Sequence, residues 1–298
     1  IEVRRHHVDI RVINLHGDTI YGEVKRIVFE NTPKYWEQLN LHIRTIAKTN
    51  DAIHRLLGVG IAFPGEVSAD RDYVIRSTVL GVKNLSIAEI QKHFSYPVYV
   101  EYGANAAGFG TVWRSKELKD AVYVIVTNNG VAGSIILNNE IYHGRTGRAG
   151  AFGHITLNPS GRKCFCGACG CWSAYNALNA LTGLDETDLD GFFKKVNNED
   201  PNAIAKWDEY LTYFADGLST VSMSFDIDIV IDGPLAVYLE PWLDTIISKM
   251  QSRPTLNGEN ISIHLDTKSE SPMAEGVALM IVAKFLNDEL DNFRFDEL

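Results

Sequence analysis

The sequence predicts a two-lobed α/β protein, and three observations support this fold class. The chain has 298 residues, which exceeds the size at which a single hydrophobic core usually keeps growing. Strand-like segments rich in β-branched residues alternate with segments whose apolar residues recur at helical spacing, a pattern typical of mixed α/β folds. Each half also opens with a pair of strand-like segments around a polar or glycine turn, which favours a duplicated design.

Residues 1–114 are predicted to form the first lobe. Alternating apolar and polar residues flank His16-Gly17-Asp18, which is the pattern of a β-hairpin. A later apolar segment ends at Pro64-Gly65, which is a turn signal. In chain order we expect a hairpin over 8–15 and 20–29, a helix over 35–57, a strand over 59–63, a helix over 86–93, a strand over 98–101 and a helix over 104–113.

Residues 115–272 are predicted to form a larger second lobe, and the C-terminal segment 273–298 is expected to join the first lobe. Asp232-Gly233-Pro234 marks a turn that starts a helix. We expect strands over 121–127 and from Gly130 to Ile136, helices over 172–181 and 203–223, a strand over 227–231, and helices over 235–250 and 273–286.

Composition restricts where the chain acts and what it binds. The formal net charge of −10 and the pI near 5.4 repel phosphate backbones, so any DNA contact is expected from a domain upstream of this chain. The chain starts at Ile1, inside a predicted core strand, and we expect that a segment preceded it. No apolar segment is long enough to span a membrane, and no signal peptide is visible, so we expect a soluble, cytoplasmic protein.

The most specific signal is a cluster of four cysteines between Cys164 and Cys171, with His154 shortly before it. Thiolates and an imidazole in a tetrahedral set favour zinc, and four protein ligands are typical of a structural site. Two alternatives remain open: four buried cysteines without a metal, and a redox pair formed by Cys166 and Cys169. Cysteines this close in sequence do not join distant parts of a fold, which agrees with a reducing cytoplasm.

The cluster and three further segments resemble the ROK family of repressors and sugar kinases. Gly-His followed by Cys-x-Cys-Gly-x-x-Gly-Cys is similar to that family's zinc signature. Three other segments resemble it along the chain: Gly60-Ile-Ala-Phe-Pro64-Gly65, Val100-Glu101 to Ala107, and Arg148-Ala-Gly-Ala-Phe-Gly-His154. The resemblance implies a two-lobed sugar-kinase/actin-like (ribonuclease H-like) fold with a structural zinc site. It also implies a Zn2+ ion on His154, Cys164, Cys166 and Cys171, with Cys169 outside the ligand set.

The same resemblance indicates that kinase chemistry is absent. Kinases of the family use the Asp of an Asn-Asp pair as general base, and this chain has Tyr102-Gly103 there. Loss of such a base costs roughly 10²–10⁴-fold in rate. The family's Asp-x-Gly-Gly-Thr phosphate loop corresponds to Glu2-Val3-Arg4-Arg5-His6, and its Gly-x-Gly-x-Gly turn reads Asn129-Gly130-Val131-Ala132-Gly133. Bulky side chains should therefore occupy the space of the ATP phosphates, and we expect no catalytic residues.

The ligand pocket is expected to differ from a plain hexose site. Residues that hold sugar hydroxyls in the family correspond here to Tyr102, Gly103, Ala151, His154 and Ser173, so the carboxylates are gone. Tyr102 could stack on a sugar or fill vacated space, and the asparagines could equally serve turns and caps. The expected ligand-binding residues are Tyr102, Asn105, Asn84, Arg148, His154 and Ser173.

The sequence therefore favours the effector domain of a ROK-family transcriptional regulator. In this interpretation a sugar or related small molecule binds the chain, which forms a homodimer, and DNA is bound by the upstream domain. Two alternatives remain: an ATP-dependent ROK sugar kinase whose motifs have diverged, and a scaffold that binds no small molecule and acts through protein contacts.

Overall fold

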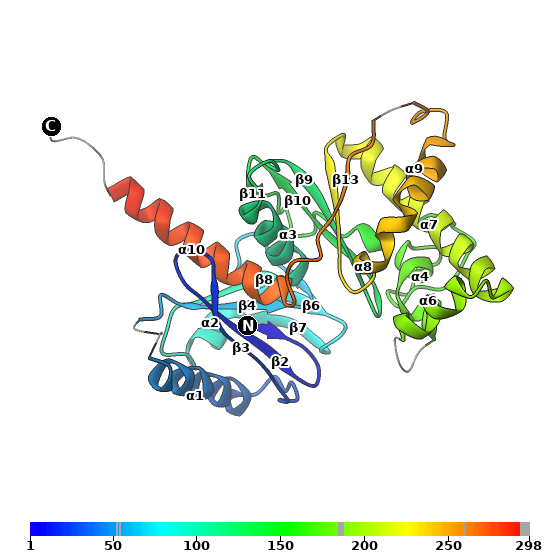
Figure 1. Cartoon of the computed structure of the whole chain (residues 1–298). Helices are drawn as coiled ribbons and strands as arrows, with labels where there is room; N and C mark the ends of the chain where they lie inside the picture. Colours follow the sequence, from blue (N-terminus) through cyan, green and yellow to red (C-terminus); the bar gives the residue numbers. More distant parts are fainter. Residues whose placement is uncertain (52, 54, 184–187, 259, 293–298) are drawn as a thin grey trace, which may run out of the picture. The chain divides into compact units, whose positions relative to one another are not determined.

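The chain folds into two compact units. In the computed structural model (Figure 1), the first unit comprises Ile1–Lys116, Glu140–Ala149 and Ser269–Leu298, and the second comprises Glu117–Asn139 and Gly150–Lys268. The structure describes all residues except 52, 54, 184–187, 259 and 293–298. The first unit thus contains both ends of the described chain, together with the short internal segment Glu140–Ala149.

A five-stranded sheet forms the centre of the first unit. Its strand order is β3-β2-β1-β4-β8, in which β1 runs antiparallel to β2 and parallel to β4, and β4 runs parallel to β8. The predicted hairpin and both predicted later strands are confirmed. The strands are β1 (Glu2–Val3), β2 (Val8–Ile13), β3 (Thr19–Lys25), β4 (Val59–Phe63) and β8 (Val98–Tyr102).

Helices cover both faces of this sheet. Figure 1 shows α1 (Pro33–Thr49) on one face, and α3 (Gly103–Arg114) and α10 (Pro272–Asn292) on the other. On the α1 side, Trp36 packs in the main hydrophobic cluster. The hydroxyl of Thr32 accepts the N–H of Tyr35 and caps α1, with proline in the first turn.

The prediction of a helix over 35–57 was too long. Helix α1 ends at Thr49, where the cap residue Asn50 takes an extended conformation and donates its N–H to the carbonyl of Ile46. The apolar residues that follow, among them Ile53 and Leu56, still pack against the core. Because these residues are buried, their apolar spacing resembles that of a helix, although α1 has already ended.

Helices α3 and α10 pack unusually closely because small residues line their contact. A Cβ added to Gly276 would lie 1.9 Å from the carbonyl oxygen of Ala106. A Cβ on Gly110 would lie 3.0 Å from the Cα of Gly276. Without these glycines the two helix backbones could not approach to this distance.

A small three-stranded sheet lies between β4 and β8 in sequence, and sequence reasoning did not find it. Its order is β5-β6-β7, with antiparallel pairing throughout. The strands are only two to five residues long and half exposed, so they lack a long apolar pattern. They are β5 (Glu66–Val67), β6 (Tyr73–Ser77) and β7 (Val82–Ser86), followed by helix α2 (Ile87–Gln91).

The other five-stranded sheet has the order β11-β10-β9-β12-β13, in which β9 and β10 form an antiparallel hairpin. Strand β12 runs parallel to both β9 and β13. The strands are β9 (Ala121–Thr127), β10 (Gly130–Leu137), β11 (Glu140–Ile141), β12 (Asp228–Asp232) and β13 (Ile263–Leu265). The β9–β10 hairpin and β12 match the predicted strands, whereas β11 and β13 were not predicted.

The helices of the second unit are more broken than their apolar patterns indicated. The predicted helix over 172–181 is interrupted at Ala177, whose ψ of 148° is extended. The helix predicted over 235–250 is interrupted by a 3-10 turn that contains Pro241. The helices are α4 (Ser173–Asn176), α5 (Asn179–Thr182), α6 (Leu189–Asn197), α7 (Pro201–Phe225), α8 (Ala236–Leu239) and α9 (Leu243–Gln251).

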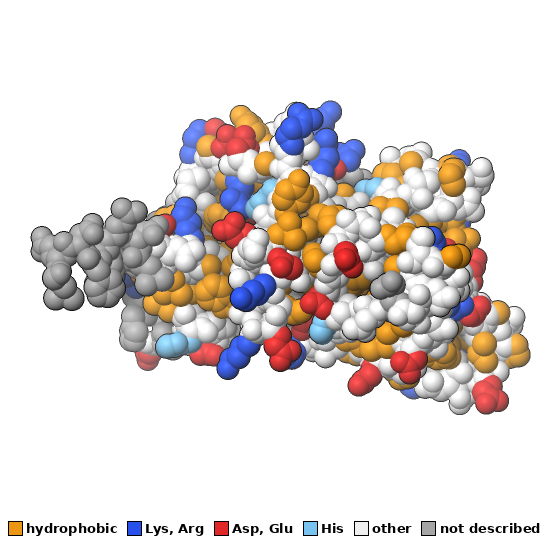
Figure 2. All heavy atoms as spheres, turned by 90° about the horizontal axis from the view of Figure 1, so that it is seen from above, with side chains coloured by type: hydrophobic (Ala, Val, Ile, Leu, Met, Phe, Trp, Pro, Cys, Tyr) orange, Lys and Arg blue, Asp and Glu red, His pale blue; other side chains and the backbone are white. Residues whose placement is uncertain are grey.

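The surface carries both basic and acidic side chains. Figure 2 shows several lysine and arginine side chains grouped at the upper edge of the view, whereas most of the acidic side chains seen there lie elsewhere. Among the described residues, no helix has the length and apolarity that crossing a lipid bilayer requires.

We predict that Gly276→Ala lowers the free energy of unfolding by about 1–3 kcal/mol, because the added methyl group forces α10 away from α3. The better helix propensity of alanine, worth about 1 kcal/mol, opposes this loss only in part. Urea unfolding followed by circular dichroism measures the effect. Lys284→Ala, at an exposed position of the same helix, is the control and should change stability by less than about 0.5 kcal/mol. If Gly276→Ala left the free energy of unfolding unchanged, this would contradict the close approach of the two helices.

Candidate functional site

The four residues expected to hold a metal lie together in the second unit. Ligand atoms of His154, Cys164, Cys166 and Cys171 all lie within 4.8 Å of one another. Nδ1 of His154 is 3.8 Å from Sγ of Cys164, and the Sγ atoms of Cys166 and Cys171 are 3.7 Å apart. Spacings of this size suit the corners of a tetrahedron around one ion, so the group could hold a metal.

Backbone turns of the cysteine loop bring these side chains together. The N–H of Cys164 donates to the carbonyl of Ala168, and the N–H of Gly167 donates back to the carbonyl of Cys164. Gly170 has a φ of +77°, and a Cβ there would lie 1.6 Å from the carbonyl oxygen of Asn158. The glycine therefore allows the loop to fold back onto the segment that follows His154.

The thiols have different proton affinities before any metal binds. Burial, and then the neighbouring thiols of Cys166 and Cys164, raise the pKa of Cys171 to about 12. Burial opposes the shift at Cys166, but the N–H of Ala168 and the neighbouring thiols lower its pKa. A metal must displace protons from such thiols, so binding here releases protons and strengthens as the pH rises.

Cys169 stands apart from this group. It is exposed, and it is not one of the residues whose ligand atoms converge. The four cysteines are free thiols in the structure. Cys169 therefore lies outside the cluster, and the family resemblance also left it outside the ligand set.

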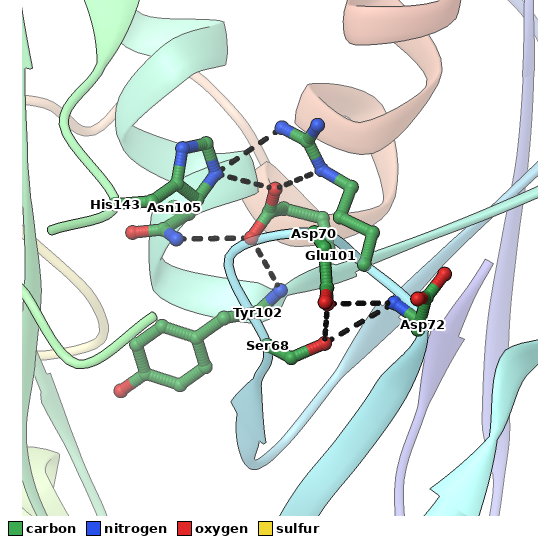
Figure 3. Close-up of polar contacts among 8 residues, drawn as sticks. Ser68, Asp70, Asp72, Glu101, Tyr102, Asn105 and His143 are labelled. Atoms are coloured by element: carbon green, nitrogen blue, oxygen red, sulfur yellow. Dashed lines mark hydrogen bonds and ion pairs between the residues drawn. The ribbon is translucent and has the colours of Figure 1, made fainter. Parts of the chain in front are cut away.

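A second polar cluster, in the first unit, is centred on the buried carboxylate of Glu101 (Figure 3). Its Oε2 accepts from Nε of Arg71 at 3.2 Å and lies 2.9 Å from Nε2 of His143. Its Oε1 accepts the amide N–H₂ of Asn105 and the backbone N–H of Tyr102, both at 2.9 Å. Burial opposes the shift, but His143, Asn105 and Arg71 together lower the pKa of this carboxyl.

Sequence reasoning quoted Glu101 in a motif but assigned it no role, and it missed His143 and Arg71. One signal was available, since Glu101 is a charged residue in an otherwise apolar strand segment. The partners come from segments far apart in sequence, so only the fold identifies them. Through Tyr102 and Asn105 the cluster holds the start of α3.

Tyr102 and Gly103 occupy the junction of β8 and α3. Burial, and then the charge of Glu66, raise the pKa of Tyr102 to about 12, so its hydroxyl stays protonated at neutral pH. A Cβ on Gly103 would lie 2.7 Å from Sδ of Met273. This position therefore has no room for a side chain unless Met273 moves.

The remaining expected ligand-binding residues lie in both units. Asn84 is exposed on β7 with a φ of +52°, and Arg148 donates from Nε to Oε2 of Glu66 at 2.8 Å, both in the first unit. In the second unit, the hydroxyl of Ser173 accepts the N–H of Val131 at 3.0 Å and is buried. Ser173 thus supports the β10 backbone, and His154 belongs to the metal cluster.

The segments expected at the ATP phosphates have other contacts. Arg5 donates to the carbonyl of Val79, and Arg4 pairs with Glu2. In the β9–β10 turn, the carbonyls of Thr127 and Asn128 accept N–H groups from the start of α5. The space beside Gly133 is taken by Phe152, since a Cβ there would lie 2.5 Å from that ring.

We predict that Glu101→Gln lowers the free energy of unfolding at pH 7 by about 2 kcal/mol, because charge-assisted hydrogen bonds are lost. A carboxyl with a lowered folded pKa stabilises the fold above its ordinary pKa of 4.5 and loses this contribution as the pH falls below that value. The variant should therefore show a flatter loss of stability between pH 7 and pH 3, measured by urea unfolding. Exposed Glu140→Gln is the control. Parallel pH profiles for Glu101→Gln and the wild type would contradict the assignment.

Comparisons with known proteins identify related sequences and structures. A xylose repressor from Caldicellulosiruptor bescii is 29% identical over 166 residues, which cover 54% of this chain and 41% of the repressor. The match thus spans less than half of that relative. A solved ROK-family transcriptional regulator, described as a homolog of the E. coli MLC protein, has a TM-score of 0.82 at 19% identity and covers 98% of this chain and 80% of that one.

Kinases of known structure have the same fold. A ROK hexokinase from Thermus thermophilus has a TM-score of 0.78 at 22% identity, over 96% of this chain and 98% of that one. At these identities the structural matches show the fold alone. The sequence model of the ROK family matches residues 1–274, and the chain therefore belongs to the ROK family.

Proposed function

We propose that the chain is the effector-binding part of a ROK-family transcriptional regulator, and that it does not phosphorylate sugars. The single observation that carries this proposal is the environment of position 103. The family resemblance places the kinase base there, and this chain has a glycine packed against Met273. The carboxylate is therefore absent, and the thioether of Met273 lies where a side chain at this position would begin.

The phosphate-binding segments support the same conclusion. Phosphates are bound by backbone N–H groups in glycine-rich turns, which must be open to the ligand. Here Arg4 and Arg5 of the first turn contact Glu2 and the carbonyl of Val79. In the second turn the carbonyls of Thr127 and Asn128 bind the start of α5, and the ring of Phe152 lies beside Gly133. Neither arrangement favours ATP.

We further infer that His154, Cys164, Cys166 and Cys171 hold a structural Zn2+ ion. Three thiolates and one imidazole form a donor set that selects zinc, and four protein ligands leave no open position for catalysis. Cys164 and Cys171 are buried, whereas His154 and Cys166 are exposed. A bound ion would fix the loop that follows His154.

The regulatory part of the proposal follows from the named relatives. A repressor and a regulator of this family resemble the chain, so we infer a small-molecule effector of the sugar class, a homodimer, and DNA binding through another domain. Free thiols at the metal site suit a cytoplasmic protein. A diverged kinase is the alternative, since sugar kinases share the fold.

We predict that the zinc-loaded chain forms no ADP above background with ATP, magnesium and a panel of mono- and disaccharides, in a coupled assay with the Thermus hexokinase as positive control. In thermal shift, a sugar should raise the Tm and ATP with magnesium should not, because only a ligand of the folded state stabilises it. Sugar-dependent ADP formation would establish the kinase alternative. No shift with any ligand would favour a scaffold that acts through protein contacts.

We predict that Cys171→Ser removes the bound metal and lowers the Tm by several degrees, because the fourth ligand of a structural site is lost. Cys169→Ser is a matched control from the same loop and should keep both metal and stability. Elemental analysis by mass spectrometry after gel filtration, together with thermal unfolding, measures the two effects. Metal loss in Cys169→Ser would instead place that thiol in the ligand set.

A further inference from the structure

The cysteine loop of the second unit is open to solvent on one side of its metal group. Cys166 belongs to that group and is exposed. The other two thiols of the group are buried, since Cys164 is 7% and Cys171 is 1% exposed. A cysteine that binds a metal is a thiolate, and thiolates are oxidised according to their exposure. A small oxidant in solution is therefore expected to react first with Cys166.

A second thiol lies close enough to Cys166 to form a disulfide with it. The Sγ atoms of Cys166 and Cys171 are 3.7 Å apart. A disulfide brings two sulfurs to about 2.0 Å, so the side chains need to approach each other by less than about 2 Å. The backbone next to Cys166 has room for this movement, because Gly167 has a φ of +95° and a Cβ there would meet no atom within 4 Å.

The other exposed thiol of the loop, Cys169, lies on the opposite face. Cys169 is paired with Lys163 in an antiparallel bridge, and residues directly opposite each other project from the same face. Successive residues of an extended segment point to opposite faces, so Cys164, which follows Lys163, projects to the other side with the metal group. A disulfide between Cys166 and Cys169 requires the loop to rearrange, whereas one between Cys166 and Cys171 does not.

We propose that the metal loop is a redox-sensitive site, at which a peroxide joins Cys166 and Cys171 in a disulfide and thereby releases the metal. The Cys166 thiolate attacks one peroxide oxygen, the O–O bond breaks, and a sulfenic acid and a hydroxide ion form. The Cys171 thiolate then attacks the Cys166 sulfur, the S–O bond breaks, and a second hydroxide ion leaves. Two thiolates thus lose two electrons, and these electrons reduce the peroxide.

The disulfide removes two of the four ligands that we propose for Zn2+, and the release of metal rests on that proposal. His154 and Cys164 remain, and two ligands do not complete a structural zinc site. The segment after His154 is bound to the start of α4, where the N–H of Trp172 donates to the carbonyl of Ile155 at 2.8 Å. Metal release therefore loosens a segment that contacts α4, and oxidation is expected to lower the Tm of the chain.

Treatment of the zinc-loaded chain with hydrogen peroxide tests the proposal through two readouts. A chromogenic chelator measures the released zinc, and we expect one zinc ion for each disulfide formed. Free thiols are alkylated with a light reagent before reduction and with a heavy reagent after it, and tandem mass spectrometry locates both labels. The heavy label is expected on Cys166 and Cys171, and the light label on Cys164 and Cys169. Dithiothreitol with added zinc should restore the metal.

Cys169→Ser is the matched variant, because it removes an exposed thiol of the same loop without removing a proposed ligand. It should release zinc at a rate within about twofold of the unchanged chain and form the same disulfide. A heavy label on Cys166 and Cys169, or loss of zinc release in Cys169→Ser, would overturn the proposal. Zinc that stays bound in excess peroxide, or oxidation that gives no disulfide, would overturn it as well.

The two readouts also separate this inference from the proposed function. A purified chain that binds no zinc would contradict the proposed metal ion and with it the metal release, while the label positions would still decide whether Cys166 pairs with Cys171. The effector role is tested by the sugar panel and does not depend on either result.

Discussion

The close approach of α10 to α3 is the contact on which the first unit depends. Gly276 lets the α10 backbone lie against the carbonyl of Ala106, and Met273 from the same helix then fills the space beside Gly103. A segment from the end of the described chain thereby determines what the start of α3 can hold. The environment of position 103, and with it our proposal that kinase chemistry is absent, follows from this packing.

The two polar clusters are stabilised by different kinds of constraint. The metal group is local, because its loop turns back through Gly167 and Gly170 and brings sequence neighbours together. The cluster around Glu101 joins side chains that lie up to seventy-two positions apart, as between Arg71 and His143. A local loop can be recognised from spacing, whereas a buried network of this kind requires the fold.

A change from kinase to sensor would alter the physical demands on the binding site. A kinase must approach ATP phosphates with open backbone N–H groups and position a base, whereas a sensor needs only selective affinity. In this chain two of the carboxylate positions that the family resemblance assigns to sugar binding are Gly103 and Ala151, neither of which has a carboxylate.

The sequence by itself determined the central strands, the opening hairpin, the long helices and the cysteine cluster, because these depend on local periodicity and spacing. Only the tertiary structure decided where α1 ends, how the helix predicted over 172–181 breaks at Ala177, and that β5, β6 and β7 form a sheet. Burial of apolar side chains is compatible with several backbone conformations, so apolar spacing alone cannot distinguish them. Charge pairing across strands, as at Glu66, depends on register, which forms only when the chain folds.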